Sequence, residues 1–129
     1  MFISKEVTLK VKGSMEIAHK LPNYDGKCSK LHGHRVEYIV SFKGEPQKDG
    51  MVEDFKELDK FIKLVSDRYD HTYLNDVFEL PTLEDFAMHF LNELNTEYGY
   101  AKQREMRGRF VELEMWETNK YGVVVTYDQ

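Results

Sequence analysis

The chain has 129 residues, of which 41% are hydrophobic and 13% aromatic, so one folded domain over residues 1–129 is expected and a disordered chain is excluded. The net charge of −5 argues against nucleic acid as the main partner, and a single cysteine excludes an internal disulfide. No signal-peptide core and no apolar run of membrane-spanning length is present, so we expect a cytoplasmic protein without membrane contacts.

The first half of the chain predicts two strands. Residues 2–21 are predicted to form a long strand, because their apolar positions recur every second residue and so share one face: Val7, Leu9, Val11, Met15 and Ile17. A polar loop is expected over residues 22–30. Residues 34–43 predict the second strand, and residues 44–50 a turn.

Two helices follow. Helical spacing of apolar residues predicts one over residues 55–69 and another over residues 83–98. Asp54, with Glu57 three residues later, resembles a capping box at the start of the first helix.

The chain ends with two more predicted strands, over residues 109–117 and 123–127, joined by a turn. The order ββααββ favours an α+β fold in which a four-stranded antiparallel sheet carries two helices on one face. Such a sheet has two open edges, which folded proteins usually cover or pair, so we expect an oligomer.

The densest chemical signal is the segment Cys28-Ser-Lys-Leu-His32-Gly-His34. Two histidines two residues apart in a strand point to the same face, and a hairpin would bring His19 alongside them. Three imidazoles with an open fourth position are typical of catalytic zinc, although a His-x-His pair alone is more often an ordinary surface feature. Cys28 is open to three interpretations: a fourth ligand, a buried apolar residue, or a thiol that Lys27 and Lys30 activate.

Two further carboxylates are candidate site residues. Asp70 directly precedes His71, and a carboxylate beside an imidazole can fix its tautomer; a histidine at a helix C-terminus is the equally weighted alternative. Glu117 continues the apolar face of a strand, where it either emerges at the strand end or binds two N–H groups of a flat heterocycle.

Taken in order, these residues resemble the family of 6-pyruvoyl tetrahydropterin and 6-carboxy-tetrahydropterin synthases. Six collinear motifs carry the resemblance: Ala18-His19-x-Leu21, Cys28-x-x-x-His32-Gly33-His34, Gly50-Met51-Val52-x-Asp54-Phe55-x-x-Leu58, Asp70-His71-x-x-Leu74-Asn75, Pro81-Thr82-x-Glu84 and Trp116-Glu117-Thr118. The resemblance implies the tunnelling fold, in which three subunits close a barrel and two barrels stack into a homohexamer.

The resemblance also implies roles for individual residues. The zinc ligands would be His19, His32 and His34; the general base would be Cys28, with Asp70 and His71 as proton-relay partners. Glu117 would anchor the pterin and take part in the relay, and Thr118 and Thr82 would line the ring pocket.

The three-residue gap between Cys28 and His32 resembles the prokaryotic 6-carboxy enzymes of queuosine and archaeosine synthesis. Such an enzyme would convert dihydroneopterin triphosphate to 6-carboxytetrahydropterin with loss of acetaldehyde and triphosphate. The alternatives are triphosphate elimination to 6-pyruvoyl tetrahydropterin and a zinc-binding module without catalysis.

Overall fold

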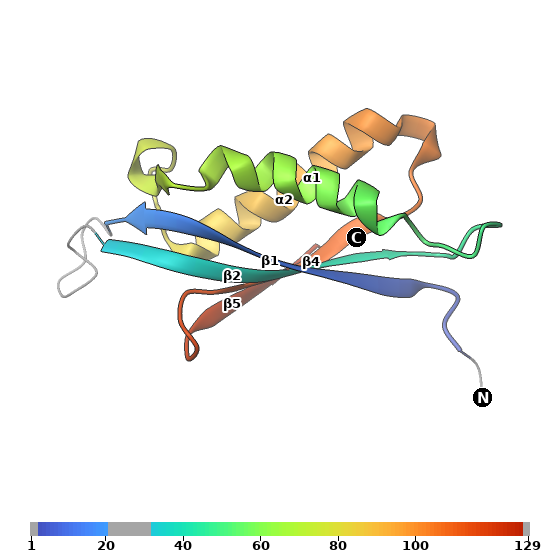
Figure 1. The fold of residues 1–129 in the computed structure, drawn as a ribbon, viewed down its shortest axis with the longest axis horizontal. Helices are drawn as coiled ribbons and strands as arrows, with labels where there is room; N and C mark the ends of the chain where they lie inside the picture. Colours follow the sequence, from blue (N-terminus) through green and yellow to red (C-terminus); the bar gives the residue numbers. More distant parts are fainter. Residues whose placement is uncertain (1–2, 21–31, 128–129) are drawn as a thin grey trace.

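The computed structural model describes residues 3–20 and 32–127, and for His32 its backbone alone. Two long strands come first, β1 (Val7–His19) and β2 (His32–Gly44). The remaining elements are α1 (Phe55–Tyr69), β3 (Thr72–Tyr73), the short 3₁₀ turn η2 (Leu74–Asp76), α2 (Leu83–Lys102), a second 3₁₀ turn η3 (Gln103–Glu105), β4 (Arg109–Trp116) and β5 (Gly122–Thr126). Both α-helices lie on the same face of the sheet (Figure 1), so the predicted ββααββ order and α+β class are confirmed.

The sheet has five strands in the order β3-β1-β2-β4-β5, one more than the sequence predicts. The four long strands are antiparallel neighbours, and the extra strand, β3, pairs in parallel with Ile17 and Ala18 of β1. A two-residue strand has too few positions to show a periodic pattern, so it could not be predicted from the sequence. Its pairing depends on the position of the chain at the end of α1.

The β1–β2 register fixes which residues face one another at the end of the sheet. Met15 and Ile17 are buried beneath the helices, and His19 continues their face. His19 pairs with His32 across the two strands, and Ile17 pairs with His34. Directly opposed residues share one face, so His34 lies on the helix side with His19.

Helix α1 has the predicted limits and cap. The Asp54 carboxylate accepts a hydrogen bond from the Lys56 N–H, at 2.9 Å. The reciprocal half of a capping box is absent among the described contacts, because the Asp54 N–H donates to Glu53 and Glu57 accepts from Lys102 instead. Asp54 therefore caps the helix by itself.

Helix α2 extends to Lys102, four residues beyond the predicted end. Nothing in residues 99–102 stops a helix except Gly99, which α2 tolerates at modest cost. The turn comes at Gln103, whose φ of 50° ends the helical path.

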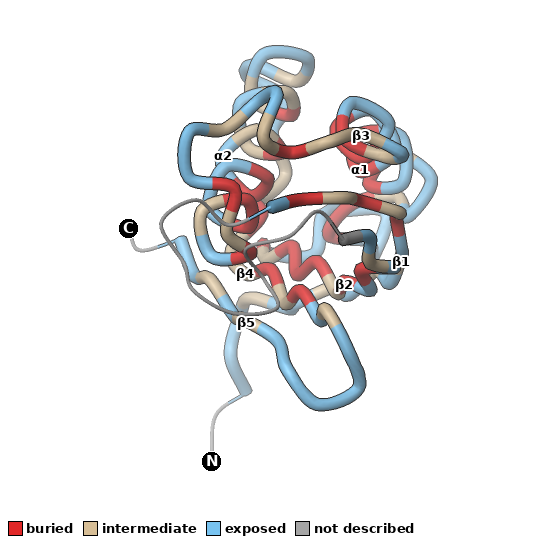
Figure 2. The backbone as a smooth tube through the Cα atoms, turned by 90° about the vertical axis from the view of Figure 1, so that its left-hand side faces the viewer, coloured by how far each residue is buried: buried red, intermediate tan, exposed pale blue. Residues whose placement is uncertain are grey.

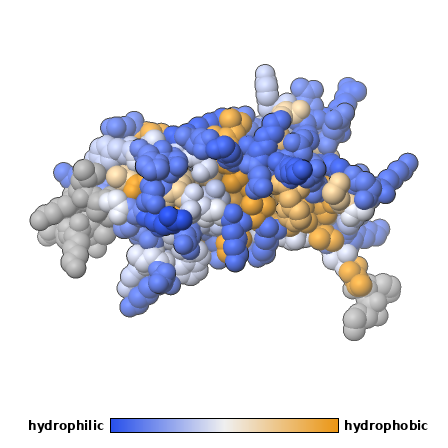
Figure 3. Space-filling model, in the orientation of Figure 1, coloured by the Kyte–Doolittle hydropathy of each residue, from blue (hydrophilic) through white to orange (hydrophobic). Residues whose placement is uncertain are grey.

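The core lies between the helices and the sheet, and Figure 2 shows buried positions gathered there. Aromatic residues of α2 and the sheet interlock, as in the edge-to-face contacts of Phe42 with Tyr98 and Phe110. Hydrophilic side chains cover most of the side seen in Figure 3, with smaller hydrophobic areas among them. Among the described residues no helix is both long and apolar enough to span a bilayer.

Candidate functional site

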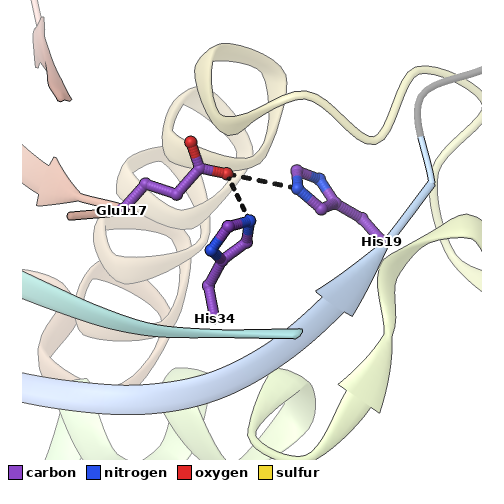
Figure 4. Close-up of side chains that lie close together, drawn as sticks. All are labelled: His19, His34 and Glu117. Atoms are coloured by element: carbon purple, nitrogen blue, oxygen red, sulfur yellow. Dashed lines mark ion pairs between the residues drawn. The ribbon is translucent and has the colours of Figure 1, made fainter. Parts of the chain in front are cut away.

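His19, His34 and Glu117 converge at the end of the sheet where β1 stops and β2 starts (Figure 4). His19 is the last residue of β1, and His34 is the third residue of β2. Pairing between β2 and β4 stops at Glu37 and Trp116, so the next residue, Glu117, leaves the ladder beside the open end of β2.

One carboxylate oxygen of Glu117 contacts both rings. Its Oε1 atom is 3.2 Å from Nε2 of His19 and 2.9 Å from Nε2 of His34. The ring centroids are 5.3 Å apart and the ring planes are inclined by 79°. Both Nε2 atoms therefore point toward one oxygen from different directions.

The His19 ring is held in one orientation by its other nitrogen. Nδ1 is 2.7 Å from the Pro81 carbonyl oxygen, which can only accept a hydrogen bond, so Nδ1 carries a proton. Burial alone would lower the pKa of His19, but the hydrogen bonds to Glu117 and Pro81 outweigh it and raise the pKa. Pro81 thereby directs Nε2 into the site, as outer-sphere carbonyls do for metal-binding histidines.

These three side chains fit a metal ion. Two imidazole nitrogens and a carboxylate oxygen, all within 4.8 Å of one another, form a donor set that Zn²⁺ accepts. Of the three ligands expected from the sequence, the structure brings His19 and His34 together, while the side chain of His32 lies outside its described part. Cys28 also lies outside the described residues.

A cavity of about 600 Å³ opens beside Glu117. Its walls come from the start of β2 and from the β4–β5 turn, and consist of Gly33, His34, Arg35, Glu37, Trp116, Glu117, Thr118 and Asn119. The Thr118 hydroxyl accepts hydrogen bonds from the Lys120 and Tyr121 N–H groups and so fixes the turn. Thr118 is thus a residue of the cavity wall.

Asp70 and His71 lie at the other side of β1. The Asp70 carboxylate accepts a hydrogen bond from the Glu16 N–H at 2.8 Å and is 3.2 Å from Nδ1 of His71. The His71 side chain is 76% exposed and lines a second cavity of about 440 Å³, which His34 also borders. The two side chains are therefore in contact, and His71 lines a different cavity from the one that Glu117 lines.

Thr82 is the N-cap of α2: its hydroxyl accepts a hydrogen bond from the Asp85 N–H. It follows Pro81, so the cap sets the position of the carbonyl that holds His19. The contact between the Pro81 carbonyl and His19 could not be predicted from the sequence, because every residue has a main-chain carbonyl.

Trp116 stands in the motif Trp116-Glu117-Thr118, but its sequence pattern predicted no role for it in the site. It is 37% exposed on a wall of the cavity, and its indole packs over Gly122 of β5. Neighbouring residues of a strand point to opposite faces, so Trp116 lies on the open face of the sheet when Met115 faces the core. This alternation in the sequence could have indicated that Trp116 is exposed.

The chain is similar to several known proteins. The sequence model of the family described as 6-pyruvoyl tetrahydropterin synthase matches residues 8–128. The 6-carboxy-5,6,7,8-tetrahydropterin synthase of Synechocystis sp. is 43% identical over 82 residues, 57% of this chain and 64% of that protein. The dihydroneopterin monophosphate aldolase of Pyrococcus furiosus is 33% identical over 94 residues, 72% of this chain and 75% of that protein.

A solved structure shares the fold along nearly the whole chain. The 6-pyruvoyl tetrahydropterin synthase of Caenorhabditis elegans superposes with a TM-score of 0.80 at 26% identity, covering 99% of this chain and 100% of that one.

Proposed function

This chain belongs to the 6-pyruvoyl tetrahydropterin synthase family, and on that premise we propose that it is a zinc-dependent 6-carboxy-5,6,7,8-tetrahydropterin synthase. The substrates would be dihydroneopterin triphosphate and one water molecule, and the products 6-carboxytetrahydropterin, acetaldehyde and triphosphate. The observation that carries the proposal is the convergence of two imidazole nitrogens and a carboxylate beside a cavity of about 600 Å³. The Synechocystis relative, which is named for the 6-carboxy reaction, supports the choice of product.

His19 and His34 would hold the zinc ion through Nε2, with His32 as the third ligand by family resemblance. Bound zinc would supply Lewis acidity, which makes a C–H bond next to a coordinated oxygen easier to deprotonate. The contribution of Pro81 is to keep the His19 ring turned so that Nε2 faces the ion.

Glu117 and Thr118 would bind the pterin ring in the cavity between β2 and the β4–β5 turn. A carboxylate offers two acceptor oxygens in one plane, which matches two neighbouring N–H groups of a flat heterocycle. Fixing the ring in this way positions the side chain of the substrate at the histidines.

Proton transfer would fall to Cys28, Asp70 and His71. Asp70 lies 3.2 Å from Nδ1 of His71 and so can hold that ring in one tautomer. In the proposed scheme the Cys28 thiolate removes a proton from the substrate side chain and His71 returns protons during carbon–carbon cleavage.

The test is to incubate the purified protein with zinc and dihydroneopterin triphosphate and to identify the products by mass spectrometry. Formation of 6-carboxytetrahydropterin together with acetaldehyde is the expected result. A 6-pyruvoyl product without acetaldehyde would assign the other reaction of the family. Zinc binding without any turnover would leave a metal-binding module and contradict the proposal.

The Pyrococcus relative raises a second candidate, an aldolase that acts on a dihydroneopterin phosphate. An aldol cleavage breaks a carbon–carbon bond but leaves the phosphate on the departing fragment. The same assay with dihydroneopterin monophosphate, read for a departing aldehyde that still carries the phosphate, separates this candidate from the synthase.

A further inference from the structure

The contacts of Glu117 have the spacing of ligands around one ion. Around tetrahedral zinc, with bonds of about 2.0–2.1 Å, neighbouring ligand atoms are about 3.3 Å apart. Oε1 of Glu117 lies 3.2 Å from one imidazole nitrogen and 2.9 Å from the other. The two nitrogens are at most 4.8 Å apart, which exceeds that spacing by at most about 1.5 Å and is within reach of a ring rotation.

The backbone that carries this carboxylate is held by hydrogen bonds within the β4–β5 turn. The Glu117 N–H donates to the Tyr121 carbonyl at 3.0 Å, and Thr118 accepts from the N–H of Tyr121. The backbone of Glu117 is therefore held next to His34. Rotation about its side-chain torsions would move the carboxylate from the histidines to the cavity.

We propose that Glu117 is itself a metal ligand in the substrate-free protein and that it leaves the metal to bind the substrate's heterocycle. This inference rests on the proposed function, which assigns Glu117 to the pterin ring. One carboxylate cannot fully satisfy both partners, so binding of the ring frees a coordination position. Recognition of the heterocycle and opening of the metal site thus become a single event.

The first test is a zinc titration of the substrate-free protein against a chromophoric chelator. Glu117→Ala and Glu117→Gln are compared with Glu37→Gln, which removes a carboxylate from the same cavity wall without a described contact to either histidine. We expect zinc to bind at least about 10-fold more weakly to Glu117→Ala, and Glu37→Gln to match the wild type. Equal or tighter binding by Glu117→Ala would overturn the inference.

The second test follows the coordination directly. Cobalt(II) replaces zinc, and its visible absorption is recorded before and after addition of 7,8-dihydroneopterin. We expect the ligand to change the spectrum of the wild type, and Glu117→Ala without ligand to differ from the ligand-free wild type and from ligand-free Glu37→Gln. Identical spectra for Glu117→Ala and the wild type would contradict the role of Glu117 as a ligand.

The two proposals can fail separately. If zinc affinity depends on Glu117 but dihydroneopterin triphosphate gives no 6-carboxy product, the proposed function fails and the ligand role survives. If the product forms and zinc affinity is independent of Glu117, the ligand role alone fails.

Discussion

Tyr98 buries its hydroxyl completely and uses it in two hydrogen bonds. It donates to the Glu53 carboxylate at 2.7 Å and accepts from the Arg107 N–H at 2.9 Å. Burial raises the pKa of Tyr98, so the hydroxyl keeps its proton as a donor. One side chain of α2 therefore ties the segment before α1 to the segment before β4.

We expect Tyr98→Phe to lower the free energy of unfolding by about 1.5–3 kcal/mol, because it leaves a buried carboxylate and a main-chain N–H without their shared partner. Urea unfolding measures the change. Tyr100→Phe is the matched control: it makes the same chemical change at a side chain that is 81% exposed and should change stability little. Equal effects of the two substitutions would show that the buried network contributes nothing.

Replacement of Cys28 by alanine tests the proposed base. We expect Cys28→Ala to bind one equivalent of zinc and to lose turnover by about 10²- to 10⁴-fold, the usual contribution of a positioned base. Metal analysis and steady-state kinetics provide the two measurements. Normal turnover would remove Cys28 from the mechanism, and loss of the zinc would make it a ligand.

At the scale of elements, hydrogen bonds between β1 and the segment that follows α1 position the Asp70–His71 dyad. His71 adopts a positive φ of 60°, its N–H donates to the Glu16 carbonyl, and the Glu16 N–H donates to Asp70. These reciprocal bonds start the parallel pairing that makes β3. The dyad therefore lies at the edge of the sheet, with its backbone hydrogen-bonded to β1.

The Asp70 contact predicts a pH dependence of stability. The hydrogen bond from the Glu16 N–H, aided by the nearby His71, lowers the pKa of Asp70 below its ordinary value of 3.8. Because the folded-state pKa is the lower one, the stabilisation is complete well above pH 3.8 and is lost as the pH falls through the folded-state pKa. Urea unfolding at several pH values should show the advantage of the wild type over Asp70→Asn shrinking in acid. A constant difference would contradict it.

The β4–β5 hairpin depends on a glycine. A Cβ at Gly122 would lie 2.5 Å from the Trp116 ring and 2.8 Å from the Met115 carbonyl oxygen. We expect Gly122→Ala to cost about 1–3 kcal/mol of stability and to shift the emission of Trp116, the single tryptophan of the chain.

Gly99→Ala is the control for this substitution, since the nearest atom to its new Cβ is 3.9 Å away. Alanine suits a helix interior better than glycine, so Gly99→Ala should raise stability by up to about 1 kcal/mol and leave the emission unchanged. Loss of stability in both variants would indicate that the crowding at Trp116 is not the cause.

At the scale of the whole molecule, the helices cover one face of the sheet and leave its long edges open. Among the described strands, β1 is paired on its outer side at Ile17 and Ala18 alone, and β5 has a partner on one side. Unpaired ladders of this length favour association with further copies.

The expected assembly is a homohexamer, which light scattering after gel filtration can test. Six chains of 15.3 kDa give a mass of about 92 kDa. A dilution series should retain that mass at assay concentrations, because strand pairing satisfies backbone groups along the whole edge. A species of monomer mass at every concentration would refute edge-to-edge assembly.

Much of the fold could be predicted from local pattern. The limits of α1 agree residue for residue, and of the apolar positions predicted for β1, Met15 and Ile17 are buried whereas Val7, the first residue of the strand, is 43% exposed. The extension of α2 and the existence of β3 could not be predicted, since each depends on neighbours distant in sequence. In the candidate site, His19, His34 and Glu117 were all identified, but Glu117 was not expected to contact the histidines.

The sequence by itself predicted the order of the two α-helices and the four long strands, the two faces of those strands, and candidate residues for a metal site and for proton transfer. These follow from spacing and side-chain chemistry, which are local properties. The tertiary structure alone decided that Pro81 orients His19 and that Glu117 meets both imidazoles. Those contacts join β1 to residues more than sixty positions away, and strand register and turn geometry set their distances.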